Sequence, residues 1–190
     1  MMDKLKTAAA AVALAATLPL ISGCSKVVDQ NPSTATKEDG TVTLATALGS
    51  QDDMQTLQSA LTASELSSLF DGPASYTLLA PNDGAFSALG EQGSALMEDE
   101  QRPLLVAILR DHILPGHVTP ETIATAVDQK GGPVTMTTLG DGTITFSKVG
   151  DRLTVSNSGG ASAGVVGTSI AANNGVVLPL DAVLMPKEEG

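Results

Sequence analysis

The 190-residue sequence predicts an α+β fold, because helix-like and strand-like patterns occupy separate parts of the chain. Residues 44–70 and 103–127 carry leucines, alanines and isoleucines at three- and four-residue spacing, as in helices that bury one face. From residue 133 onward, short segments rich in Val, Ile and Thr are separated by Gly, Asp or Asn, as in strands joined by turns. Helices first and strands afterwards are typical of the α+β class.

The first helical region, residues 44–70, predicts two or three short helices that pack one apolar face. Residues 75–81, SYTLLAP, predict a short buried strand. Asn82 then suits the N-cap of a helix that ends before Gly90.

Two further helices are expected before the strands begin. Residues 103–114 carry an apolar stripe with Pro103 at the first helical position, and residues 119–127 follow with Thr119 as cap. The remaining segments read as strands of a β meander: 133–139, 142–149, 151–158, 164–170, 175–180 and 181–186.

Phe86 lies where the first strand turns into its helix, and it is one of three phenylalanines in the chain. A large aromatic side chain stabilises a fold mainly when it is buried in the core. We expect it to be buried with Leu79, Leu105, Ile108 and Val183.

The N-terminus has the pattern of a secretory signal peptide over residues 1–23. Two lysines precede an uncharged run over residues 7–21, and small residues follow it. A membrane-spanning helix needs about 20 apolar residues, whereas Pro19 interrupts the end of this shorter run. The secretory interpretation is therefore favoured.

The residues Ile-Ser-Gly-Cys that end at Cys24 resemble the bacterial lipobox. This resemblance implies that Cys24 becomes the mature N-terminus and carries a diacylglyceryl thioether and an N-acyl chain such as palmitate. Cys24 is the only cysteine, so it has no disulfide partner within the chain. Two or more acyl chains give stable membrane anchoring. We expect a lipid-anchored protein of the bacterial cell envelope, in the outer membrane of a Gram-negative cell, facing the surface or the periplasm.

Composition divides the rest of the chain into a tether over residues 24–40, one domain over 41–186 and a tail over 187–190. The tether is rich in charge and turn formers and shows no period. Removal of residues 1–23 takes away two lysines and one aspartate, which leaves 8 basic and 20 acidic residues and a net charge of −12. Such a surface repels nucleic acid, so that class of partner is excluded. We expect a monomer.

Three segments in order resemble the fasciclin domain: YTLLAPNDGAFSAL (76–89), LLVAILRDHILPG (104–116) and NGVVLPLDAVLMP (174–186). The resemblance implies a β-wedge of two packed sheets with flanking short helices. It also implies adhesion, or binding of extracellular polymers or proteins, with no cofactor and no catalytic residues general to the family.

The resemblance also marks candidate interaction residues within these segments. The family's tyrosine before the central histidine is Asp111 here, and the histidine often found in the third segment is Leu178. A receptor contact through that tyrosine is therefore not implied for this chain. The candidates are Asn82, Asp83, Asp111, His112, Asn174 and Asp181.

The stretch HILPGH holds both histidines of the chain, His112 and His117. Zinc-binding histidines on one helix face are four residues apart, whereas these are five apart and a Pro-Gly turn separates them. No second Cys/His cluster completes a four-ligand site. A haem held by one histidine is the open alternative, without an aromatic cradle. We interpret His112 as a buried structural residue and His117 as an exposed turn residue.

Other catalytic patterns lack their context. Residues 160–164 match the hydrolase pattern G-x-S-x-G, but both histidines precede the serine and a strand is expected after it. No phosphate-binding G-x-x-x-x-G-K-[ST] sequence occurs. The acidic residues at 98–100 lack the alternating ligands of a calcium loop.

Two functions of different class remain open. The first is a non-enzymatic surface lipoprotein whose fasciclin-like domain mediates cell adhesion or binds matrix polymer. The alternative is a periplasm-facing lipoprotein that binds a small apolar ligand between its helices and its β-wedge.

Overall fold

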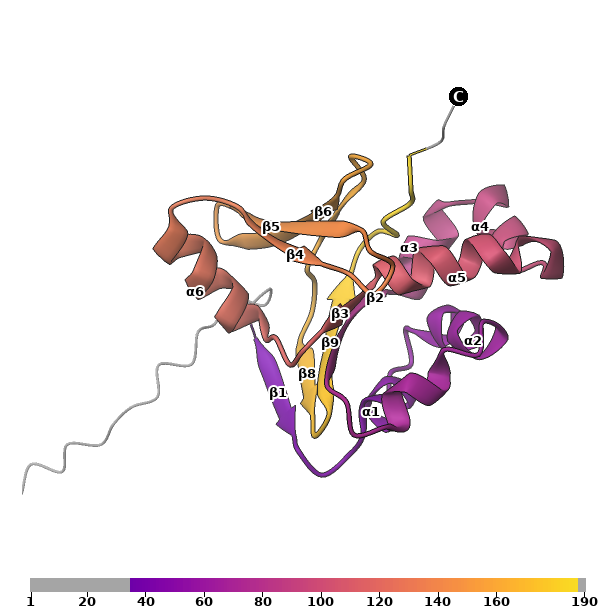
Figure 1. Ribbon diagram of the computed structural model, residues 1–190, viewed down its shortest axis with the longest axis horizontal. Coiled ribbons are helices and arrows are strands. Elements are labelled where there is room, and N and C mark those ends of the chain that lie inside the picture. Colours follow the sequence, from indigo (N-terminus) through magenta and orange to yellow (C-terminus); the bar gives the residue numbers. More distant parts are fainter. Residues whose placement is uncertain (1–34, 188–190) are drawn as a thin grey trace, which may run out of the picture.

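The computed structural model describes residues 35–187, and these form two sheets with helices around them (Figure 1). The signal peptide, Cys24, most of the expected tether and residues 188–190 lie outside the described residues.

The larger sheet has five strands in the order β1-β8-β9-β2-β3. The central strands β9 and β2 are parallel, as are the edge strand β1 and its neighbour β8, whereas the other two pairs are antiparallel. The strands are β1 (Thr36–Asp39), β2 (Tyr76–Pro81), β3 (Ile113–Pro115), β8 (Ser169–Ala172) and β9 (Gly175–Leu180).

The smaller sheet is an antiparallel meander of four strands in chain order. Tight turns rich in Gly and Asp join the strands, as the sequence predicts. The strands are β4 (Val134–Thr137), β5 (Thr143–Val149), β6 (Arg152–Asn157) and β7 (Ser162–Gly164).

Helices α1–α5 lie on one side of the five-stranded sheet, whereas α6 lies on the other side with the four-stranded sheet (Figure 1). Two short 3-10 helices, η1 (Ser67–Asp71) and η2 (Asp99–Gln101), complete the helical side. The α-helices are α1 (Leu44–Gly49), α2 (Gln55–Ala63), α3 (Asp83–Ala88), α4 (Glu91–Leu96), α5 (Arg102–Asp111) and α6 (Pro120–Lys130).

The five-stranded sheet is therefore buried on both faces and separates two apolar cores. Successive side chains of a strand point to opposite faces, so Leu78 of β2 packs among the helices and Leu79 faces the smaller sheet. Phe86 is buried with Leu105, Ile108 and Val183, as expected. The expectation that Leu79 joins them is wrong, because that side chain lies in the other core.

The expected α+β wedge is confirmed: two packed sheets are flanked by short helices. Among the described residues, no helix is long and apolar enough to cross a membrane.

Several elements differ from the expectation. The expected meander is divided between the two sheets, because β8 and β9 belong to the larger sheet. The strand expected over residues 164–170 is instead the end of β7 and the start of β8. The expected tether overlaps β1, which is a polar edge strand without apolar periodicity, so the folded part begins before residue 41. The helix expected over residues 103–114 ends at Asp111, and its apolar end forms β3 instead. Residues 181–186 form no strand, although Val183 and Leu184 are buried.

Candidate functional site

Asn82 and Asp83 join strand β2 to the helical layer. The Asn82 side chain accepts a hydrogen bond from the Ala85 N–H at 2.8 Å and so caps α3, as expected. Asp83 accepts from the N–H groups of Thr56 at 2.8 Å and Gln55 at 3.3 Å, at the start of α2. Desolvation acts to raise the pKa of Asp83, but the hydrogen bonds from Thr56 and Gln55 outweigh it and lower the pKa. Both side chains therefore stabilise the N-terminal ends of helices, Asn82 at α3 and Asp83 at α2.

Asn174 lies in the turn between β8 and β9 and connects it to two distant segments. It is 7% exposed, and its Oδ1 accepts from the Leu44 N–H at 2.7 Å. Its Nδ2 donates to the carbonyls of Phe70 at 2.8 Å and Gly72 at 2.9 Å. Every polar atom of this amide is therefore used within the domain.

Asp181 follows β9 and links the two sheets. Its Oδ1 accepts from the Gly164 N–H at 2.6 Å, and its Oδ2 lies 3.6 Å from Arg152 Nη2. The Asp181 carboxylate therefore connects β6 and β7 to the C-terminal segment.

His112 caps the C-terminal end of α5 and is 1% exposed. Its Nδ1 lies 2.8 Å from the Ile108 carbonyl, and its Nε2 accepts from the Leu184 N–H at 3.1 Å. These partners assign the proton of the neutral ring to Nδ1. Burial lowers the pKa of His112, an effect only partly offset by the Ile108 hydrogen bond and the Asp111 charge.

His112 is buried with both ring nitrogens in hydrogen bonds, as expected of a structural residue. Both ring nitrogens are occupied, so the ring offers no lone pair to a zinc ion or haem. His117 is exposed beyond the turn, as expected. Across residues 35–187, no group of three or more His, Cys, Asp or Glu side chains could hold a metal ion.

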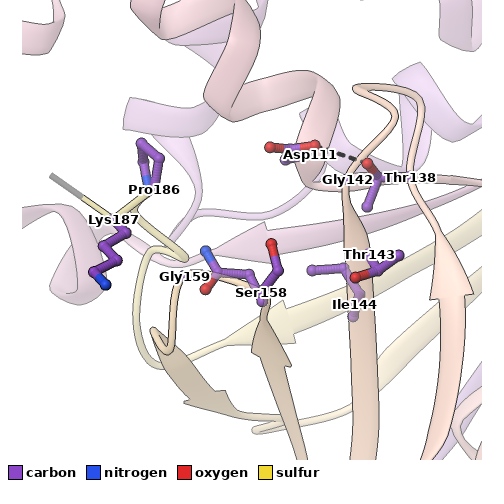
Figure 2. Close-up of a pocket in the computed structure, with 10 residues that line it drawn as sticks. Asp111, Thr138, Gly142, Thr143, Ile144, Ser158, Gly159, Pro186 and Lys187 are labelled. Atoms are coloured by element: carbon purple, nitrogen blue, oxygen red, sulfur yellow. Dashed lines mark hydrogen bonds between the residues drawn. The ribbon is translucent and has the colours of Figure 1, made fainter. Parts of the chain in front are cut away.

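Asp111, the neighbour of His112, differs from the other candidates because it lines an open pocket of about 210 Å³ (Figure 2). Its Oδ1 accepts a hydrogen bond from the Thr138 hydroxyl at 2.7 Å. The pocket walls come from the end of α5, two turns of the smaller sheet and the C-terminal segment. The lining residues beyond Asp111 and Thr138 are Gly142, Thr143, Ile144, Asn157, Ser158, Gly159, Pro186 and Lys187.

The C-terminal wall of this pocket, residues 184–187, is fixed from two sides. His112 holds the Leu184 N–H, and the Asn157 amide donates to the carbonyls of Leu184 at 3.3 Å and Met185 at 2.8 Å. Residues 181–186 therefore form an irregular segment. The side chains of His112 and Asn157 bond to backbone N–H and C=O groups that would otherwise pair with a neighbouring strand.

A family model described as the Fasciclin domain matches residues 52–186. The chain belongs to the fasciclin family. The residues that the family resemblance marks are therefore mostly the hydrogen-bonding framework of a fasciclin domain.

Two relatives illustrate the range of the family. Protein sll1483 of Synechocystis sp. is 27% identical over 191 residues, which cover 96% of this chain and 99% of that protein. Transforming growth factor-beta-induced protein ig-h3 of Sus scrofa is 30% identical over 137 residues, which cover 72% of this chain and 18% of that protein.

A solved structure shows the same fold. The FAS1 domain pair from the insect cell adhesion molecule fasciclin I matches with a TM-score of 0.67 at 16% identity. The match covers 77% of this chain and 51% of that chain. Fasciclin domains thus occur in surface proteins that include a cell adhesion molecule.

Sequence reasoning singled out Asp111 but missed the rest of its pocket in this fasciclin domain. Thr143, Ser158 and Lys187 lie in three separate turns or ends, so no short motif contains them. The hydrolase-like pattern is not an active site, because Ser162 begins strand β7 and the next element is a strand.

Proposed function

We propose that this protein is a lipid-anchored surface protein of bacteria whose fasciclin domain binds an extracellular polymer or protein without catalysing a reaction. The lipobox-like sequence before Cys24 supports the anchor. Membership of the fasciclin family supports a binding role, since the family includes adhesion proteins.

One observation carries the preference for binding over catalysis. Five of the six marked side chains each form at least one hydrogen bond with the backbone of the domain, whereas the sixth, Asp111, lines an open pocket. Catalysis of acyl transfer requires a nucleophile and a base within hydrogen-bond reach of each other. His112, the buried histidine, instead bonds two backbone groups. This arrangement favours recognition of a ligand at the surface.

The alternative, an apolar ligand between helices and wedge, has less support. An apolar-lined hollow among α1, α2 and η1 has a volume of about 150 Å³ and is lined by Leu48, Leu61 and Phe70. Sites for drug-sized ligands have roughly 300–1,000 Å³. This hollow is too small for a sterol or an acyl chain.

Exposure on the cell decides between outward and periplasmic orientation. Whole cells that carry the full-length protein are treated with protease, and the fasciclin domain is followed by immunoblot. We expect loss of the domain in intact cells, whereas a periplasmic control protein survives. Protection of the domain until the outer membrane is opened would contradict surface display.

Binding is tested by retention of the purified protein on isolated matrix polymer and on intact cells. The soluble protein for this assay begins at Ala35, because a chain that begins at Thr41 lacks β1. Retention above that of an unrelated acidic protein is expected. Equal retention of both proteins would contradict the proposed function.

A further inference from the structure

The Asp111 pocket combines a fixed carboxylate with free hydroxyl groups. The carboxylate rests against the turn between β4 and β5, where Gly140 and Gly142 leave room for it. A Cβ at Gly142 would lie 2.6 Å from Asp111 Oδ1, so this position accepts no side chain without displacing the carboxylate. The Thr138 hydroxyl then fixes Oδ1. The second oxygen, Oδ2, points away from Thr138 and over the pocket (Figure 2).

The opposite wall presents Ser158, whose hydroxyl points toward Asp111 across the pocket (Figure 2). Within residues 35–187, neither the Ser158 hydroxyl nor the Thr143 hydroxyl has a hydrogen-bond partner in the domain. A hydroxyl both donates and accepts, whereas an ionised carboxylate only accepts. The pocket therefore offers both kinds of hydrogen bond to a ligand.

Charge and size restrict the class of ligand. Asp111 disfavours an anion, and Lys187 at the rim disfavours a cation, so the pair favours a neutral molecule. The volume of about 210 Å³ is below that of sites for drug-sized ligands. The exposed ring of Pro186 adds an apolar part to the lining. These features match one sugar unit, which carries hydroxyl groups around an apolar ring face.

We infer that the Asp111 pocket binds one neutral sugar unit of an extracellular polysaccharide, with Asp111 Oδ2 accepting from a sugar hydroxyl and Ser158 opposite it. This inference deepens the proposed function and rests on it, because it names the class of polymer that the domain would meet at the cell surface. Asp111 stands where the family resemblance places a tyrosine.

The test uses the full mature chain with Cys24→Ser, labelled with ¹⁵N, and follows backbone amides of Gly142 and Gly159. The probes are neutral sugars (glucose, galactose, mannose, xylose and N-acetylglucosamine) and their charged counterparts glucuronate and glucosamine. We expect at least one neutral sugar to shift these amides saturably, with a Kd in about the millimolar range for so small a ligand. The two charged sugars should bind more weakly.

Variants identify the group responsible. Asp111→Asn keeps the shape and the Thr138 contact but removes the charge, so we expect Kd to rise about tenfold. Ser158→Ala should weaken binding less. Glu100→Gln, the matched control, removes one negative charge from η2, away from the pocket, and should leave Kd unchanged. Unchanged melting of each variant shows that the fold is intact.

Three results would overturn the inference: no neutral sugar shifts the pocket amides, Asp111→Asn binds as well as wild type, or a charged sugar binds tightest. If the protein is retained on matrix polymer but no sugar shifts the pocket amides, the pocket assignment is wrong and the proposed function still holds. If sugars shift the pocket amides but the domain is protected from protease on whole cells, the pocket assignment holds and surface display is contradicted.

Discussion

At the scale of single residues, the polar side chains of the signature segments act mainly as connectors between elements. Asn174 is buried and joins the start of α1 to two carbonyls near η1. His112 joins α5 to the C-terminal segment in the same way. Burial of a polar side chain lowers the stability of the fold little when all its hydrogen bonds are made. Loss of the side chain leaves each of its partners without a hydrogen bond. These positions are therefore expected to be sensitive to substitution.

The two histidines should differ sharply in their effect on stability. His112→Ala leaves the Leu184 N–H without its acceptor and opens a void, so we expect a loss of about 1–3 kcal/mol in the free energy of unfolding. His117→Ala, the matched control at an exposed position, should stay within about 0.5 kcal/mol of wild type. Denaturant curves with and without EDTA measure both. Equal losses that EDTA reproduces in wild type would contradict the structural role.

The pH dependence of stability provides a separate test of His112. Its pKa is lowered in the folded protein, so below about pH 6.5 the unfolded chain binds a proton that the folded protein does not. Wild type should therefore lose stability as the pH falls through this window. His112→Ala lacks this contribution, so the stability difference between the two should narrow by up to about 1.4 kcal/mol per pH unit. Denaturant curves between pH 7.5 and 5 measure it, and a constant difference would contradict the prediction.

At the scale of elements, periodicity identified those helices and strands whose burial follows a simple pattern. Helix α5 has an apolar stripe, and in β5 and β6 buried residues alternate with less buried ones. The sequence predicts these elements because each of them buries one face. The strand β9 buries both faces and was readable as a continuous apolar run. These features depend on local sequence alone.

The missed elements depend on contacts with distant segments. Strand β1 has a polar sequence and exists because the edge of β8 is available to pair with it. The apolar residues 113–114 fit a helix or a strand equally well, and pairing with β2 decides in favour of β3. The pocket is assembled from turns that no local pattern relates. The sequence patterns therefore predicted most helices and strands, and the family resemblance implied the two packed sheets and marked the framework residues. Neither indicated the edge strand β1 or most of the site.

Removal of β1 should measure the contribution of this edge strand. A chain that begins at Thr41 exposes the edge of β8 and loses the hydrogen bond from Thr36 Oγ1 to Glu121 Oε2, 2.9 Å long. Each lost hydrogen bond contributes about 0.5–1.5 kcal/mol, so we expect Tm to fall by at least about 4 °C. The matched control begins at Ala35 and keeps the strand. Equal Tm values for the two chains would show that β1 adds no stability.

At the scale of the whole molecule, an acidic fasciclin domain follows a short segment and a lipobox-like cysteine. Residues 24–190 have a net charge of −12, counted from 8 basic and 20 acidic residues. Like-charged surfaces repel one another, so such a domain stays away from an anionic membrane. The proposed membrane attachment therefore depends on the N-terminal lipobox-like sequence.

Substitution of the lipobox cysteine tests that attachment. Cys24→Ser removes the thiol that the diacylglyceryl group would modify, while Ser25→Ala, the matched control, leaves it in place. Each buried methylene of an acyl chain contributes about 0.8 kcal/mol, so two or more chains should hold wild type and the control in the detergent phase of a Triton X-114 separation. Cys24→Ser should appear in the aqueous phase or as the uncleaved precursor. Partition of this variant into detergent at its mature size would show that something other than Cys24 anchors the protein.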